Sequence, residues 1–325
     1  MEPDEPALTE EQRSAGAEEQ GGQGYDNCGV GGIIRGDEKA LVVKMLHQDR
    51  EPMPGGSVPD WLARFVSERE FVTVEDVLKG NASVTRKTAS EYLYRLGAKG
   101  VLFGAGHGLY RRRALPTFEL FLSERMLEVQ TKIQHLLPFT PFTIWSTEQL
   151  APVAHLLMGW HIIFVEADGE VVPAIHSVLL EQDEMALLDP KKEELAKFLD
   201  LTRKPVVVRS RSETTATVEV NGVRTATPEK LLIDLYFDLS RGYLNLGLDE
   251  FGRMLRNSIA HYALNFVLLL SYASRRKIRG EIQYLLKQLK DHTPLAVWVD
   301  GPGDPGDKEA EIDAIVEGAR GAAER

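Results

Sequence analysis

Residues 59–113 limit the possible folds of this chain more than any other stretch of its sequence. Residues 59–68, 73–80 and 85–97 each place apolar side chains at helical spacing. Thr73 and Asp76 have the spacing of a capping box, and Thr85 stands where the N-cap of the third helix is expected. Two short apolar segments, 101–103 and 109–110, flank a glycine-rich turn at 104–108, which is typical of a β-hairpin. The pattern predicts three helices followed by a hairpin.

This order of elements is that of a winged helix-turn-helix, whose third helix enters the major groove of DNA. The exposed face of that helix offers donors suited to phosphates and base edges. The predicted contact residues on it are Thr85, Arg86, Lys87, Thr88, Ser90 and Arg95. His107 in the turn and the run Arg111, Arg112 and Arg113 are predicted to reach flanking phosphates. A winged helix that binds another protein, with these charges solvated, is the alternative.

The charge of the chain is unevenly distributed, which matters for any nucleic-acid partner. The formal net charge of −11 comes from the two ends, because residues 1–26 hold eight acids and one base and residues 300–325 hold eight acids and three bases. Residues 59–113 instead hold ten bases and six acids. We expect a disordered or poorly ordered leader at 1–58 and an acidic disordered tail at 300–325. We hypothesise that these ends weaken non-specific DNA binding by competing for the basic face.

Residues 114–299 read as a second, mixed α/β domain. Helical patterns at 118–136, 146–157, 171–180 and 191–199 alternate with apolar strand patterns at 143–145, 161–165, 185–188, 205–209 and 216–220. The continuous apolar stretch 161–165 predicts a strand covered on both faces. A turn is expected at Asn221-Gly222, and Pro228 stands at a first helical position. Helical patterns at 249–258, 259–274 and 279–289 complete the chain. The predicted fold class is therefore α+β: an N-terminal winged helix-turn-helix followed by a mixed α/β domain that ends in a helical bundle.

A second basic patch is possible in this domain. It would consist of Arg209, Arg211, Arg275, Arg276, Lys277 and Arg279. Four of these follow the long apolar helix, where cations are favourable for the helix dipole alone. A positive surface there could also meet an acidic partner or a phosphate backbone.

Little in the sequence predicts enzymatic chemistry. A single cysteine, Cys28, excludes an internal disulfide framework and a cysteine-based zinc cage, and the scattered histidines predict no metal site. No nucleophile elbow is present. We expect no cofactor, and a cytoplasmic protein without a targeting or membrane segment. A nuclease or nucleotidyl-handling enzyme is an alternative, which metal-dependent cleavage that is lost on changing Asp189 or Glu166 would support.

The chain resembles the AbiEi-type antitoxins of type IV toxin–antitoxin systems, which act in abortive infection. The resemblance rests on residues 71–78, 85–96 and 108–110 in the first region. In the second it rests on 220–234, 144–147, 164–166 and the segment from Tyr262 and Asn265 to Tyr272 and Arg276. It implies a non-enzymatic DNA-binding repressor of its own operon. It also implies an antitoxin that opposes a nucleotidyltransferase-like toxin without needing a stable complex.

Overall fold

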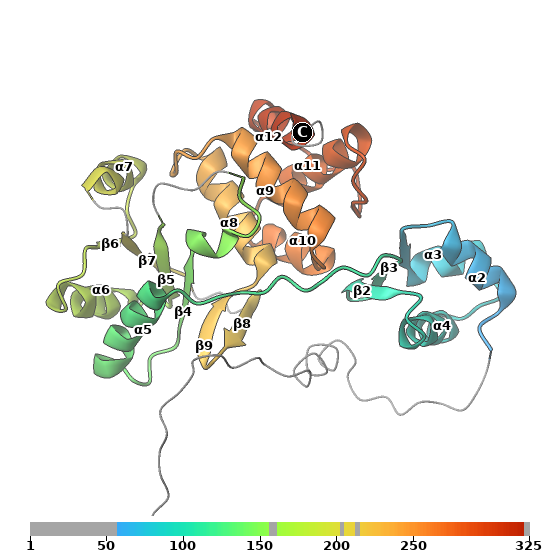
Figure 1. The fold of residues 1–325 in the computed structure, drawn as a ribbon, viewed down its shortest axis with the longest axis horizontal. Coiled ribbons are helices and arrows are strands. Elements are labelled where there is room, and N and C mark those ends of the chain that lie inside the picture. The colour runs from blue at the N-terminus through green and yellow to red at the C-terminus, as the bar shows by residue number, and fades with distance from the viewer. Residues whose placement is uncertain (1–56, 156–160, 202–204, 212–214, 322–325) are drawn as a thin grey trace, which may run out of the picture. The chain divides into compact units, whose positions relative to one another are not determined.

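The computed structural model describes residues 57–155, 161–201, 205–211 and 215–321, and these form a mixed α+β protein (Figure 1). The expected leader, including Cys28, lies outside the described residues apart from its last two positions. None of the helices in the described ranges combines the length and the apolar character that crossing a membrane requires.

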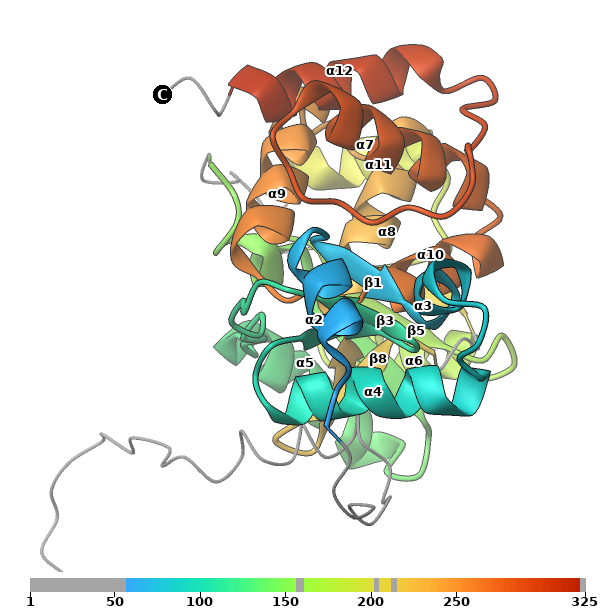
Figure 2. The same ribbon diagram turned by 90° about the vertical axis from the view of Figure 1, so that its right-hand side faces the viewer.

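The first group of elements follows the order expected from the sequence (Figure 2). Helices α2 (Asp60–Ser67), α3 (Val74–Gly80) and α4 (Arg86–Ala98) accompany strands β1 (Phe71–Thr73), β2 (Phe103–Gly106) and β3 (Leu109–Arg111). The strands form an antiparallel sheet in the order β1-β3-β2. The capping box is confirmed: the Thr73 hydroxyl accepts from the Asp76 amide, and the Asp76 carboxylate accepts from the Thr73 amide. A separate apolar core joins the helices to the sheet; it includes Leu62, Val66, Val72, Val77, Ala89, Leu93, Leu96 and Leu102.

A four-stranded sheet with helices on both faces forms the middle of the chain. Its strands are β4 (Phe142–Ser146), β5 (Ile163–Ala167), β6 (Ala186–Leu188) and β7 (Val206–Ser210), in the order β4-β5-β7-β6. β4 is antiparallel to β5, and the other pairs are parallel. Helices α5 (Glu124–Leu136) and α6 (Val172–Glu181) cover one face, and α7 (Lys192–Leu201) links β6 to β7. Every residue of β5 is buried. The apolar stretch 161–165 predicts this for Ile163, Phe164 and Val165, and the charged Glu166 is buried as well.

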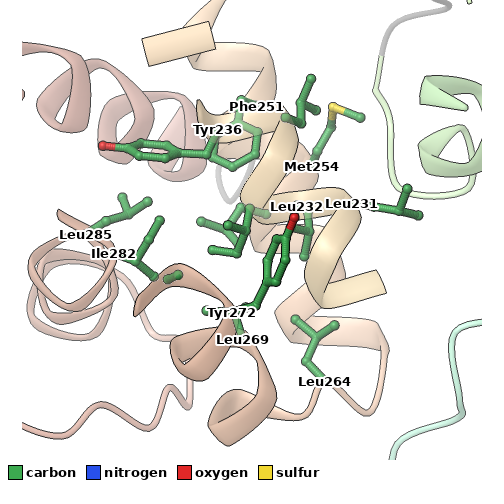
Figure 3. Close-up of a cluster of buried hydrophobic side chains, with 14 of the residues drawn as sticks. Leu231, Leu232, Tyr236, Phe251, Met254, Leu264, Leu269, Tyr272, Ile282 and Leu285 are labelled. Carbon is green, nitrogen blue, oxygen red and sulfur yellow. The ribbon is translucent and has the colours of Figure 1, made fainter. Parts of the chain in front are cut away.

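A hairpin and a group of helices complete the fold. Strands β8 (Thr217–Val220) and β9 (Val223–Ala226) meet at Asn221-Gly222, where φ is 50° and 78°, as the Asn-Gly sequence favours. Helices α8 (Pro228–Ser240), α9 (Leu248–His261), α10 (Phe266–Arg275) and α11 (Arg279–His292) follow. The Thr227 hydroxyl caps α8, and Pro228 opens it as expected. Figure 3 shows the apolar side chains that these helices bring together, among them Leu231, Tyr236, Phe251, Leu269 and Ile282.

Four predicted helices differ in their bounds. The helix expected over 118–136 begins only at Glu124, because the Ser123 hydroxyl accepts from the Met126 amide and caps it there. The helix expected over 146–157 is a 3₁₀ turn over Thr147–Leu150 in the described part of that range. The two helices expected over 249–258 and 259–274 divide later than expected. The first continues to His261, and the second begins at Phe266, since the Asn265 side chain caps it by accepting from the Leu268 amide.

The prediction of a disordered acidic tail at 300–325 is wrong for residues 309–321, which form helix α12 (Glu309–Gly321). Its apolar residues recur at helical spacing and are buried in the main core; they are Ile312, Ile315, Val316 and Ala319. The helix crosses α9 at very short range. A Cβ atom added at Gly252 would overlap the backbone oxygen of Ile315, and one added at Gly318 would overlap the backbone of Asp249. The acids within α12, which are Glu309, Glu311, Asp313 and Glu317, therefore lie on the side of the helix away from the core.

Contacts connect the β1-β3-β2 sheet with the start of α10. The ring of Phe71 meets that of Phe266 edge to face, with centroids 5.7 Å apart. Leu109 and Ala105 are buried in the same core as α10, and Gly106 leaves no room for a side chain beside Val267. One side of the hairpin is therefore covered by protein.

Candidate nucleic-acid interface and a buried charge cluster

Helix α4 exposes a polar face suited to DNA. Ala89, Leu93 and Leu96 are buried, so residues three and four apart on the opposite side, Lys87, Ser90 and Tyr94, lie on the outer face. The helix starts at a side-chain cap, because the Thr85 hydroxyl accepts from the Thr88 amide. The two threonine hydroxyls also lie 2.8 Å apart.

The cations of α4 differ in their ion pairs. Arg86 is exposed and pairs with Glu75 of α3, and Arg95 pairs with Glu91 one turn before it. Lys87 is exposed and forms no ion pair with any of the residues that the structure describes. Two of the predicted readout residues are thus engaged with carboxylates, while Lys87 is the cation best placed for a phosphate.

The hairpin places its predicted contact residues unequally. His107 is exposed at the turn, and Arg113 is exposed just after β3. Arg112 is half exposed, donates to the carbonyl of Ser67 and lies 3.8 Å from Glu70.

The prediction that Arg111 contacts phosphate is wrong. Its residue exposure is 3%, and its guanidinium donates to the carbonyl of Leu264. Burial lowers the pKa of Arg111, against the opposing influence of Glu70 and Glu229. Side chains alternate along a strand, so Leu109 and Arg111 share one face of β3 and Tyr110 lies on the other. The face with Leu109 is buried, and Arg111 therefore points inward.

The predicted second basic patch is not a patch. Arg275 and Lys277 are exposed, and Arg279 pairs with Asp300 at 2.8 Å. Arg209, Arg211 and Arg276 instead point into the protein and are neutralised by carboxylates.

These arginines belong to a buried charge cluster, which we define by Glu166, Arg209, Arg211, Lys230, Asp234, Asp238, Tyr272 and Arg276. Asp234 is its centre, with no exposed surface. One carboxylate oxygen lies 2.8 Å from Arg211 and 3.1 Å from Arg276, and the other lies 2.5 Å from the ammonium of Lys230. The same ammonium lies 2.7 Å from Glu166. The cluster joins the carboxyl ends of β5 and β7 to α8 and α10.

Electrostatics hold the cluster in its ionised form. Burial favours the neutral acid at Asp234 and Glu166, but Arg211 and Lys230 outweigh it and lower the pKa of both carboxyls. Burial likewise disfavours the ammonium of Lys230, yet Glu166 and Asp234 raise its pKa. Desolvation and the neighbouring carboxylate raise the pKa of Tyr272. Glu166, Asp234 and Lys230 therefore stabilise one another in their charged forms, which suits them to fixing the structure.

The two residues named for the nuclease alternative have different environments. Glu166 is inside the charge cluster, while the exposed Asp189 accepts from the Ser210 amide at 3.0 Å. Within the described ranges, no three histidine, cysteine or acidic side chains gather as a metal site would require.

Part of the cluster was detectable in the sequence. Lys230 and Asp234 are four residues apart in a mostly apolar helix, which is the spacing of an ion pair on one helix face. Their partners Glu166 and Arg211 come from distant strands, so no local pattern identifies them.

Comparison with known protein families identifies the family of the chain. A family described only as "Family of unknown function (DUF6577)" matches residues 88–292. The chain belongs to this family. The matched segment runs from α4 through α11 and includes the whole charge cluster. No curated protein matches the chain.

Proposed function

We propose that residues 59–113 act as a winged helix-turn-helix and that the protein is a DNA-binding transcriptional regulator. The observation that carries the proposal is the exposed polar face of α4. This helix follows α3 through a short turn and precedes an antiparallel hairpin, which is the order of such a module. Arg111 leaves the set of predicted DNA contacts because it is buried. The set that remains is Thr85, Arg86, Lys87, Thr88, Ser90, Arg95, His107, Arg112 and Arg113.

Resemblance to the AbiEi-type antitoxins extends this proposal. The protein would repress its own operon from the cytoplasm, without catalysis or cofactor. It would also oppose a nucleotidyltransferase-like toxin without a stable complex. The charge cluster supports this reading of the second region as a scaffold, because its ionisable groups hold one another instead of facing a substrate.

Binding to DNA upstream of the gene itself, measured by electrophoretic shift over a salt series, tests the first part. Each phosphate contact that is lost should reduce the slope of log K against log salt by about 0.9. We expect Lys87→Gln and Arg113→Gln each to reduce the slope by about that amount. Lys290→Gln, an exposed lysine on α11, should leave the slope unchanged. Absence of salt-sensitive binding at low salt would refute DNA binding, and unchanged affinity in the first two variants would favour a protein-binding module.

Co-expression tests the antitoxin role. A nucleotidyltransferase-like gene beside this one should arrest growth when expressed alone, and the intact chain should restore growth. Failure to restore growth while DNA binding persists would leave a regulator without antitoxin activity.

A further inference from the structure

Strand β6 is an outer strand of the four-stranded sheet, at the end opposite β4 (Figure 1). It pairs with β7 on one side, and in the described part of the chain no strand lies on its other side. The backbone groups of an outer strand that face away from the sheet are a template for pairing with another strand. We call this side of Ala186–Leu188 the β6 edge.

Hydrogen bonds to β7 show which backbone groups lie at the β6 edge. The Met185 carbonyl accepts from β7, and the Asp189 amide donates to it, so the odd-numbered residues face β7. The N–H and C=O groups of Ala186 and Leu188 therefore face the β6 edge. The Ala186 carbonyl lies there 3.2 Å from the ring of His176 on α6, and the next outward residue, Leu188, is exposed.

Exposed apolar side chains gather around the β6 edge. Leu188 is 38% exposed, and Met185, just before the strand, is 47% exposed. Leu180 is 50% exposed and lies one turn after His176 on the same side of α6. Because the His176 ring reaches the β6 edge, Leu180 borders that edge as well. Large apolar side chains exposed together in this way indicate a surface that another protein covers.

The charges beside β6 are self-complementary. Asp183 lies four residues before Leu187, the middle residue of the strand, and Lys191 lies four residues after it. Both charged residues are exposed, and neither side chain forms an ion pair with a residue that the structure describes. An antiparallel pair of β6 strands with a two-fold axis at Leu187 would bring Asp183 of each copy to Lys191 of the other. The charges of this edge thus match those of a second copy of the same edge.

We propose that a second copy of this chain covers the β6 edge, so that the protein is a homodimer with one continuous sheet, to which each copy contributes four strands. Ala186 of each copy exchanges backbone hydrogen bonds with Leu188 of the other, since both present outward groups. The two Leu187 residues form the non-hydrogen-bonded pair on the axis. Leu188 lies on the same face of the sheet as α6, where it meets Leu180 at the junction of the two copies.

Sedimentation of the full chain over a concentration series tests the proposal. The mass should approach twice the 36.3 kDa of one chain as the concentration rises toward about 100 μM. Leu188→Lys should weaken association at least about tenfold, because a lysine on an edge strand opposes pairing. Leu127→Lys replaces a similarly exposed leucine on α5 and is the control, which should associate as the unchanged chain does. A monomer at every concentration would overturn the proposal.

Charge reversal tests the two ends of the interface. Lys191→Glu brings two acids together at each end and should weaken association about tenfold. Adding Asp183→Lys should restore most of the affinity, because it re-forms both pairs with the charges exchanged. Since φ is 55° at Asp183, circular dichroism first establishes that the double variant is folded. A folded double variant that associates as weakly as Lys191→Glu would contradict the proposed pairing.

Cysteine substitution tests the register of the two strands. In a Cys28→Ser background, which removes the one natural cysteine, Leu187→Cys places two thiols in a non-hydrogen-bonded pair. The Cα atoms of such a pair lie about 4.5 Å apart, within disulfide range, so oxidation should link the two chains covalently. Leu188→Cys is the matched control, because its two Cα atoms would lie more than about 7 Å apart and should rarely link. Equal linking by both variants, or none by Leu187→Cys, would overturn the proposal.

Discussion

Replacing Lys230 with methionine is the most direct test of the charge cluster. The substitution keeps most of the side-chain volume and removes only the ammonium. That ammonium lies 2.7 Å from Glu166 and 2.5 Å from Asp234, and both carboxylates are almost completely buried. Removing one partner of a buried ion pair costs about 3–5 kcal/mol. Because Arg211 still contacts both carboxylates, we expect Lys230→Met to lower the free energy of unfolding by about 3 kcal/mol at pH 7.

The deficit should depend on pH with a defined sign. In the unchanged chain the pKa values of Glu166 and Asp234 are lowered, so their contribution to stability is present above the unfolded pKa and is lost as the pH falls. When Lys230 is removed, its lowering influence is lost, and the pKa values of Glu166 and Asp234 rise relative to those in the unchanged chain. The variant then takes up a proton at a higher pH. The difference in stability should therefore be largest at neutral pH and decrease as the pH falls toward about 4.

Urea unfolding followed by circular dichroism from neutral pH downward measures both effects. Lys287→Met, an exposed lysine on α11, is the control and should change little. Adding Glu166→Gln to Lys230→Met should recover part of the loss, because it removes one of the two buried carboxylates that would otherwise share Arg211. If Lys230→Met matched the control at neutral pH, the idea that buried ion pairs fix the two strands to α8 and α10 would be wrong.

Three further substitutions test local features by urea or thermal unfolding. Gly252→Ala should lower the free energy of unfolding by about 1–3 kcal/mol, because the added Cβ forces α9 and α12 apart. Gly97→Ala is the control and should be neutral or stabilising, since no atom lies nearer than 3.8 Å to its added Cβ. Equal effects of the two substitutions would refute the close crossing. Thr73→Ala should cost about 1 kcal/mol through the lost cap of α3, and an unchanged unfolding temperature would contradict this. Arg111→Met should lower the unfolding temperature and leave the DNA affinity of the folded protein unchanged. Arg113→Gln should weaken DNA binding and leave the unfolding temperature unchanged.

Local sequence signals predicted the elements that local interactions determine. The capping residues Thr73 and Thr85, the Asn221-Gly222 turn and the start of α8 at Pro228 all lie where the sequence places them. Each depends on residues within a few positions, so a short stretch of sequence contains all of the information.

Features that depend on distant contacts were missed. Arg209 and Arg211 looked like surface cations, because the carboxylates that neutralise them lie on α8 and β5. The acidic composition of residues 300–325 masked an amphipathic helix, whose burial depends on a glycine at position 252 of another helix. Charge averaged over a segment gives no information about which face of a helix carries it.

The position of α12 sets where this chain can be shortened. The family match ends at residue 292, so a shortened protein would ordinarily be cut there. Such a version would remove Ile312, Ile315 and Val316 from the core and leave their apolar contacts on α9 facing water. An exposed apolar surface of this kind promotes self-association. A usable domain therefore extends beyond the family boundary, through residue 321.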